Sequence, residues 1–171
     1  MRAALLDHAD LSQLQLLHDR CSDFFVLTSG APAPPDAAEE MVHDLPPGRT
    51  LADKFVVGCW VADQLVAAAD LVRGLRRSDD WCIGLFLVTP ALRNHGRGTA
   101  ILTGLLHWLA SMGASSVCLV VQKQNIGALR FWTRSGFQTY EATVQRFGSL
   151  NNEVLKMEML LRDSEHAQPG T

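Results

Sequence analysis

Apolar and polar residues follow a pattern that predicts several β-strands interspersed with helices. Residues 54–72, KFVVGCWVADQLVAAADLV, form two strand-like runs around a turn near 62–64, which predicts a β-hairpin. Residues 81–88 and 115–121 are largely apolar, a composition typical of strands that are covered on both faces. We therefore expect these two strands near the centre of a sheet.

Strand-like runs near the two ends of the chain predict the remaining strands. Residues 2–7 read as one short strand at the N-terminus. Residues 138–147 and 153–161 alternate between polar and apolar side chains and are joined by GSLNN, residues 148–152. This arrangement predicts a second hairpin.

Other stretches have apolar residues at the spacing of an amphipathic helix. Asp10 is the expected cap of the first helix, and Gly113 and Gly136 are the expected ends of two others. Asn125 is the expected cap of the last helix. The predicted helices cover residues 11–21, 36–43, 99–112 and 125–136.

The predicted order of elements, β-α-α-β-β-β-α-β-α-β-β, indicates an α/β (α+β) fold in which helices cover a mixed sheet. The chain has 171 residues, of which 47% are hydrophobic and 19% charged, as expected for one globular domain. We place this domain at residues 1–162. Residues 163–171, DSEHAQPGT, are predicted to be a disordered tail.

Composition and charge exclude several classes of function. The formal net charge is -3 and no basic run is present, so a nucleic-acid partner is not expected. No apolar run approaches the ~20 residues of a membrane span, and the N-terminus does not resemble a secretory leader, so we expect a cytoplasmic protein without a membrane partner. The cysteines, Cys21, Cys59, Cys82 and Cys118, are scattered singly, so neither a metal site nor a disulfide framework is expected.

The segment RNHGRG, residues 93–98, lies between a buried strand and a helix. The first turn of a helix has backbone N–H groups without internal partners, and the helix dipole adds partial positive charge there. Gly96 and Gly98 leave room for a diphosphate to approach these groups. Arg93 and Arg97 add mobile positive charge. The segment predicts an anion site; the alternative is an ordinary turn made tight by glycines.

This segment resembles a signature of the GNAT superfamily of N-acyltransferases, [RQ]-x-x-G-x-[GA]. Residues 87–102 resemble the strand-turn-helix motif of that family, and NIGALRFWTRSGF, residues 125–137, resembles its second motif. The resemblance extends over about residues 54–161, and the predicted strand order is that of the family. It implies the GNAT fold: a mixed, mostly antiparallel sheet that splays between two parallel strands and is flanked by about four helices.

The resemblance also implies acetyl-CoA as cosubstrate and no metal. The diphosphate would lie on the backbone of residues 94–99, and the pantetheine arm would pair with the strand at 86–88. Asn125 would contact the cofactor from the other side of the splay. The residues that the resemblance assigns to the cofactor are Phe86, Leu87, Val88, Arg93, Asn94, His95, Gly96, Arg97, Gly98, Thr99, Asn125 and Trp132.

The usual catalytic residues of the family are missing at their positions. Many members have a tyrosine as general acid seven residues after the motif asparagine, where this chain has Trp132. Indole can donate a hydrogen bond but is not a useful acid. Many members also have a glutamate on one of the two central strands, but residues 81–88 and 115–121 contain no acidic side chain.

Two other residues are candidates for proton transfer. Asp70 lies in a half-buried apolar strand, which predicts a raised pKa that suits a base or a binder of a cationic amine. The alternative is a structural role, in which Asp70 pairs with Arg73 or with a backbone N–H at a bulge. Tyr140, the single tyrosine, is an alternative acid.

We therefore expect an N-acetyltransferase that acts on a small-molecule primary amine by direct attack in a ternary complex. A protein N-terminus or lysine is the second enzymatic possibility. An acyl-CoA-binding sensor with little turnover is the rival from another class, favoured by the missing tyrosine and glutamate. The last hairpin, residues 141–160, leaves an apolar edge that suits a homodimer.

Overall fold

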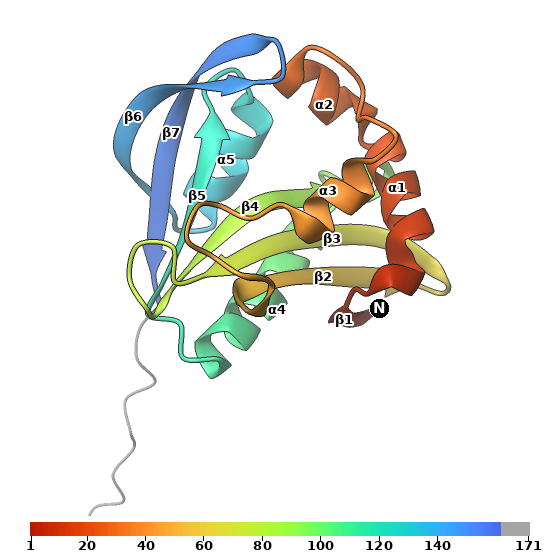
Figure 1. Cartoon of the computed structure of the whole chain (residues 1–171), viewed down its shortest axis with the longest axis horizontal. Coiled ribbons are helices and arrows are strands. Elements are labelled where there is room, and N and C mark those ends of the chain that lie inside the picture. Colours follow the sequence, from red (N-terminus) through yellow and green to blue (C-terminus); the bar gives the residue numbers. More distant parts are fainter. Residues whose placement is uncertain (162–171) are drawn as a thin grey trace, which may run out of the picture.

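The computed structural model describes residues 1–161, so the tail predicted over 163–171 lies outside the described residues. Within this part, the strands form one seven-stranded sheet in the order β1-β2-β3-β4-β5-β7-β6 (Figure 1). The strands are β1 Arg2–Leu5, β2 Lys54–Val61, β3 Gln64–Arg73, β4 Asp80–Val88, β5 Ser116–Gln122, β6 Gln138–Phe147 and β7 Leu150–Leu160.

The sheet splits between its two central strands. β4 and β5 are the parallel pair, and they pair only between residues 80–83 and 116–119. Beyond Ile83, β4 continues along β3, whereas β5 continues along β7. The strands therefore diverge, as Figure 1 shows between its green and turquoise arrows. All other neighbouring strands are antiparallel, so the predicted mixed and splayed sheet is confirmed.

Helices cover both faces of the sheet. On one face, α1, α2 and α3 lie over β2, β3 and β4, with Leu14 and Leu17 of α1 fully buried. On the other face, α4 and α5 bury Leu109 and Trp132 against the strands. The helices are α1 Leu11–Arg20, α2 Ser22–Ser29, α3 Ala37–His43, α4 Arg97–Ser111 and α5 Ile126–Arg134, with 3-10 turns at His8–Asp10, Leu51–Asp53 and Pro90–Leu92.

The N-terminal helical region differs from the prediction in two respects. Asp10 occupies the N-cap position of α1, as predicted, but its side chain does not cap the helix, because its Oδ2 accepts from the N–H of Asp7 at 3.1 Å. Asp7 in turn caps the preceding 3-10 turn, where its Oδ1 accepts from the N–H of Ala9 at 2.7 Å. The predicted first helix also ends sooner, since a turn at Cys21 separates α1 from α2. Residues 1–161 therefore contain five α-helices rather than four, and neither glycine nor proline marks this break.

The C-terminal hairpin is confirmed, but its loop is shorter than predicted. β7 begins at Leu150, which pairs with Phe147, so the turn consists of residues 148–149 instead of 148–152. Gly148 has a left-handed φ of +53°, which explains why so tight a turn is possible here. The homodimer expected through this hairpin stays a prediction.

The cysteines differ from expectation in one pair. Cys82 and Cys118 are register partners on β4 and β5, with Cα atoms 4.6 Å apart, and a disulfide joins them at the root of the splay. Their separation of 36 residues gives no sign of this pairing, because it arises from the parallel register of two distant strands. Cys21 and Cys59 are buried thiols.

Two further findings concern the described residues 1–161 as a whole. No helix among them is both long and apolar enough to cross a lipid bilayer. No cluster of three or more His, Cys, Asp or Glu side chains in this range could hold a metal ion.

Candidate functional site

The splay between β4 and β5 opens into a cavity of about 1480 Å³ that reaches both faces of the sheet. On one side it is lined by the N-terminus of α4, by α5 and by β5; we call this part the α4–α5 half. On the other side it is lined by α1, α2 and α3, together with Asp70 and the turn of the last hairpin; we call this part the α1–α3 half. β4 forms the border between the two halves.

The end of β4 has a free backbone edge. The N–H of Thr89 donates to the carbonyl of Val66 on β3 at 2.9 Å. Alternate residues of an antiparallel strand face the same neighbour, so Leu87 also bonds β3, while Phe86 and Val88 face away from it. Since β5 has already diverged, the N–H groups of Phe86 and Val88 point into the splay. These are two of the three strand residues predicted to meet the cofactor, and all three line the cavity.

The loop before α4 turns sharply where the anion site is predicted. Asn94 and Gly96 have left-handed φ angles of +62° and +73°. Gly96 is the N-cap of α4, and a Cβ at this position would meet no atom within 4 Å. The first-turn N–H groups of α4 are therefore accessible to a ligand. Of the residues predicted here, Asn94, Gly96, Gly98 and Thr99 line the cavity, whereas His95 and Arg97 are exposed and lie outside its lining.

Arg93 lines the cavity but is not the mobile positive charge that the sequence predicted. Its Nε donates to the carbonyl of Val88 at 2.8 Å, and its Nη1 and Nη2 donate to the two carboxylate oxygens of Asp23 at 2.5 and 3.3 Å. Burial alone would raise the pKa of Asp23, but the contact with Arg93 lowers it overall. Arg93 therefore ties the end of β4 to α2.

α5 supplies the opposite wall of the α4–α5 half. Asn125 is its cap, as predicted, with Oδ1 accepting from the N–H of Ala128 at 3.1 Å. Trp132 is 7% exposed, and its ring lies 5.6 Å from that of Phe86 and 4.9 Å from that of Phe131. Asn125 and Trp132 both line the cavity, so the structure brings them together with the loop before α4.

Sequence reasoning missed two cations on α5. Arg130 and Arg134 are exposed, line the cavity and stand one helical turn apart. Their spacing of four residues was visible in the sequence, but which face of the helix would meet the splay was not.

Asp70 lies on β3 in the α1–α3 half, opposite Leu85 of β4. Lys54 Nζ forms an ion pair with Asp70 Oδ1 at 2.9 Å and also donates to the carbonyl of Asp44 at 2.8 Å. Asp70 Oδ1 is therefore buried against the ammonium of Lys54. Burial raises the pKa of Asp70, and the neighbouring Lys54 only partly opposes this effect.

Asp70 does have a structural ion pair, but its partner is Lys54 rather than Arg73 or a backbone N–H at the bulge. Arg73 instead lies beside Asp53, with Nη2 3.7 Å from Oδ1. A bulge does follow Asp70, but its Oδ1 accepts no backbone hydrogen bond there. Asp70 Oδ2 lies over Gly84 of β4, so close that a Cβ on Gly84 would come within 2.8 Å of it.

His18 is a second polar group of this half that sequence reasoning missed. It is 1% exposed, lines the cavity, and has its Nδ1 2.8 Å from the carbonyl of Leu14. A carbonyl only accepts, so Nδ1 carries the hydrogen and Nε2 is left as an acceptor. Burial lowers the pKa of His18, and the bond to Leu14 opposes this only in part. Its place in the apolar stripe with Leu14 and Leu17 was the available signal.

Tyr140 does not belong to this site. Its ring is 47% exposed on β6, 5.3 Å from the guanidinium carbon of Arg76, and it does not line the cavity. The structure does not bring Tyr140 together with Asp70, and Tyr140 lies outside the cavity in which the other predicted residues meet.

The C-terminal end of α2 closes one side of the α1–α3 half. The carbonyl of Thr28 accepts from Asn152 Nδ2 at 2.7 Å and from Gln122 Nε2 at 3.2 Å. Ser149 Oγ, in the hairpin turn, donates to the carbonyl of Ser29 at 3.4 Å. Figure 1 shows α2 beside the tip of the β6–β7 hairpin. A bound molecule therefore cannot extend past this end without breaking these contacts.

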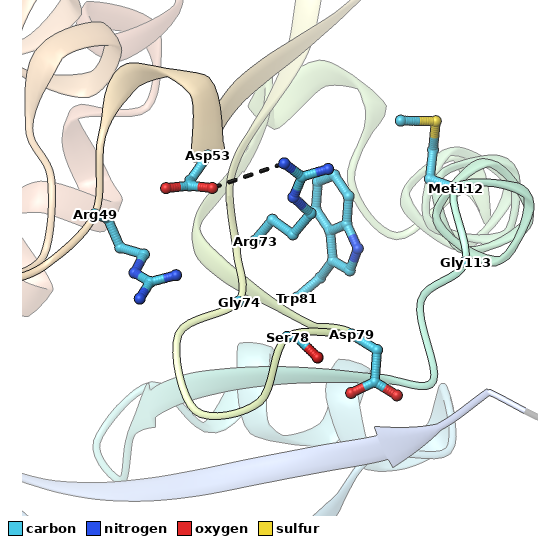
Figure 2. A pocket seen from close by; sticks show the side chains of 9 residues that line it. All are labelled: Arg49, Asp53, Arg73, Gly74, Ser78, Asp79, Trp81, Met112 and Gly113. Atoms are coloured by element: carbon cyan, nitrogen blue, oxygen red, sulfur yellow. Dashed lines mark ion pairs between the residues drawn. The ribbon is translucent and has the colours of Figure 1, made fainter.

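A smaller hollow of about 370 Å³ lies away from this cavity and shares no lining residue with it. Figure 2 shows Arg73 pointing toward Asp53, with Arg49 and Asp79 at its edges. Its two arginines are matched by two carboxylates, so it shows no preference for a ligand of either charge.

Solved structures share the fold over nearly the whole chain. The ribosomal-protein-S18-alanine N-acetyltransferase from Escherichia coli is 16% identical, with a TM-score of 0.70, covering 98% of this chain and 97% of that chain. The ribosomal-protein-alanine N-acetyltransferase from Brucella melitensis is 14% identical, with a TM-score of 0.71, covering 94% and 100%. The protein yncA from Salmonella typhimurium, solved with its cofactor acetyl-CoA, is 17% identical, with a TM-score of 0.67, covering 99% and 97%.

No curated protein matches the sequence significantly. Residues 15–137, well over half of the chain, match the acetyltransferase (GNAT) family. The match includes the loop before α4 and extends to the end of the second motif, which are the parts that carry the resemblance in the sequence. The chain therefore belongs to the acetyltransferase (GNAT) family.

Proposed function

We propose that the protein transfers the acetyl group of acetyl-CoA to the primary amine of a small molecule, by direct attack while both are bound. One observation carries the proposal. The free edge of β4 at Phe86 and Val88 runs directly to the N-terminus of α4 at Gly96, inside one cavity. One continuous path in the cavity thus offers backbone N–H groups first for an extended thioester arm and then for a diphosphate.

The α4–α5 half suits acetyl-CoA, the cofactor found with yncA, in its positive charge. We expect the N–H groups of residues 96–99 to donate to the diphosphate, and Arg130 and Arg134 add positive charge nearby. Asn125 uses its Oδ1 to cap α5, which leaves its amide nitrogen as a donor. Trp132 provides an apolar wall rather than an acid.

Acetyl-CoA supplies a thioester whose carbon–sulfur bond breaks as the amine nitrogen forms the amide bond. The N–H of Phe86, which faces the splay, is placed to stabilise the carbonyl oxygen as it gains negative charge. Asp70, one strand away, binds the ammonium and receives its first proton. The second proton of the amine passes through water to the leaving thiolate, because β4 and β5 carry no acidic side chain at the splay.

A small acceptor is favoured over an internal lysine of a protein. The contacts of Thr28 and Ser29 with the last hairpin close one end of the α1–α3 half. An extended peptide laid across the site needs both ends open, whereas a small amine needs a single entrance. A second candidate, the acyl-CoA-binding sensor, is favoured by Trp132 in place of the usual tyrosine.

The test is acetyl-CoA binding by calorimetry, followed by thiol release over a panel of amines. Wild type is compared with Gly96→Glu, which places a side chain and a negative charge at the proposed diphosphate site. Gly113→Glu is the matched control: Gly113 has a similar φ of +81°, also has open space, and lies at the other end of α4. Both variants therefore carry the same backbone strain.

We expect micromolar binding by wild type and Gly113→Glu, at least 100-fold weaker binding by Gly96→Glu, and thiol release with at least one amine. Binding without thiol release for any amine would support the sensor instead. Failure of wild type to bind acetyl-CoA would contradict the proposal.

A further inference from the structure

Charge is divided between the two halves of the cavity. The arginines in its lining are Arg93, Arg130 and Arg134, and all three lie in the loop before α4 or on α5. The acidic residues in the lining lie on the other side: Asp23, Glu40, Asp44 and Asp70. Arg93 and Asp23 neutralise one another across the border. What remains is a cationic α4–α5 half and an anionic α1–α3 half.

Few positive charges oppose the carboxylates of the α1–α3 half. Lys54 offsets one of them, since its Nζ lies 2.9 Å from Asp70 Oδ1. His18 faces the same space, but burial lowers its pKa and favours the neutral ring. Glu40 and Asp44 are exposed at the entrance, near α3. An acceptor that carries a carboxylate of its own would meet these negative charges on entry and at the bottom of the site.

The remaining walls of this half are apolar. The rings of Phe24 and Phe25 meet edge to face, with centroids 5.1 Å apart, and Phe25 stacks on His18 at 5.4 Å. Met41 of α3 and Leu85 of β4 complete the surface around Asp70. Aromatic and thioether side chains bind flat apolar groups well, and they offer no hydrogen bonds to a polar chain.

Asp70 has one carboxylate oxygen that is open to a ligand. Its Oδ1 pairs with Lys54 at 2.9 Å, whereas its Oδ2 lies over Gly84 in the lining of the cavity and accepts no hydrogen bond from residues 1–161. A carboxylate accepts several donors, so a ligand that brings N–H groups binds Oδ2 without displacing Lys54. An ammonium group has three such donors and no acceptor.

We propose that the acceptor is a lipophilic amine of the arylalkylamine type, whose single charge is its ammonium group, and that Asp70 binds this group. The inference rests on the proposed function and names the acceptor class of the same site. The aromatic body lies between Phe24, Phe25 and Met41. The ammonium lies at Asp70, one strand away from the free edge at Phe86, which is where the attack on the thioester takes place.

The test compares three amines that differ in one respect each. 2-Phenylethylamine has the proposed chemistry, phenylalanine adds a carboxylate, and 1,4-diaminobutane replaces the ring with a second cation. In a thiol-release assay we expect kcat/KM for 2-phenylethylamine to exceed that for phenylalanine by at least 100-fold and that for 1,4-diaminobutane by at least 10-fold. Equal or higher kcat/KM with either of the other amines would overturn the proposal.

Variants test the part played by Asp70. We expect Asp70→Asn and Gly84→Ala, which crowds the same carboxylate, each to raise the KM or Kd for 2-phenylethylamine at least 10-fold. Acetyl-CoA affinity should stay within twofold, which shows that the variants are folded. Asp63→Asn, in the exposed β2–β3 turn, is the matched control and should equal wild type. An unchanged KM and Kd in Asp70→Asn would overturn the proposal.

Direct calorimetry of 2-phenylethylamine without acetyl-CoA separates this inference from the proposed function. Binding that depends on Asp70 but is followed by no thiol release supports the inference and contradicts the acetyltransferase proposal. Thiol release with other amines but no binding of 2-phenylethylamine contradicts the inference alone.

Discussion

The two halves of the cavity are built from different parts of the chain. The α4–α5 half relies on backbone: the N–H groups of Phe86 and Val88 and the first turn of α4 after Gly96. The α1–α3 half relies on side chains, chiefly Asp70 of β3 and Phe25 of α2, and its helices pack on the sheet through a separate, smaller core. A site made of backbone N–H groups can bind the cofactor with few constraints on the side chains. A site made of side chains can change its acceptor when those side chains are substituted.

The aromatic side chains that line the two halves also differ in how far they are buried in the hydrophobic core. Trp132 is part of the larger core on the α4–α5 face, whereas Phe24 and Phe25 are only partly buried beside the smaller one. Substitutions in the wall of the α4–α5 half should therefore mainly lower stability. Substitutions in the wall of the α1–α3 half should mainly change which amine is accepted.

The largest effect is expected from Trp132→Ala. The Trp132 ring contacts those of Phe86, Phe131 and Phe137 at centroid distances of 5.6, 4.9 and 5.2 Å. Its removal leaves a cavity and should lower the free energy of unfolding by about 3–5 kcal/mol. Phe24→Ala, in the α1–α3 half, should lower the free energy of unfolding by well under half of this amount and should mainly raise KM for the amine. Urea denaturation measures the stability of both variants. Equal losses of stability would contradict the difference between the two halves.

Substitution of Arg93 should mainly lower stability, whereas substitution of Arg97 should mainly weaken acetyl-CoA binding. Arg93 joins β4 to Asp23, so Arg93→Met should lower the free energy of unfolding by about 1–3 kcal/mol, as expected when a charged hydrogen bond is lost. Arg97 is exposed at the start of α4, so Arg97→Met should leave stability within about 0.5 kcal/mol and weaken acetyl-CoA binding severalfold. Urea denaturation and acetyl-CoA calorimetry on both variants test this comparison. An Arg93→Met variant that is stable but does not bind acetyl-CoA would instead support the phosphate-binding role predicted from the sequence.

A smaller effect is expected from the entrance of the α1–α3 half. Glu40→Gln removes an exposed carboxylate near a cationic acceptor and should raise its KM about two- to fourfold at low salt. The difference from wild type should shrink as salt is added. A salt-independent change in KM would point to direct contact instead. Glu39→Gln, on the same helix but outside the cavity lining, is the matched control.

The smallest effect is a change in the pH dependence of stability. Burial lowers the pKa of His18 below its usual 6.5, so the unfolded chain binds a proton more readily than the folded one. The stabilisation is present above about pH 6.5 and is lost as pH falls through the lowered pKa, by at most about 1.4 kcal/mol per pH unit. His18→Gln should flatten this slope between pH 7 and 5, measured by urea denaturation. The same replacement at the exposed His107 should retain it, because His18 is still present.

Most of the α4–α5 half could be predicted from the sequence, because its elements are local. The glycine loop, the helix after it and the Asn125 cap are each written in a few adjacent residues. The role of Arg93 could not be predicted, since it depends on Asp23, 70 residues away in sequence.

The α1–α3 half was largely hidden in the sequence. Asp70 stood out as a charge in an apolar strand, but its neighbour Lys54 comes from the adjacent strand and depends on the hairpin register. The disulfide between Cys82 and Cys118 arises from the register of two distant strands as well. No periodicity in the sequence encodes such contacts between distant elements.

The central claim is that the free edge of β4 and the N-terminus of α4 together bind acetyl-CoA. A crystal structure of the complex with acetyl-CoA tests this most directly. We expect the pantetheine arm to pair with the backbone of Phe86 and Val88, and the diphosphate to accept hydrogen bonds from the N–H groups of residues 96–99. Acetyl-CoA bound elsewhere, for example at the hollow in Figure 2, would contradict the account.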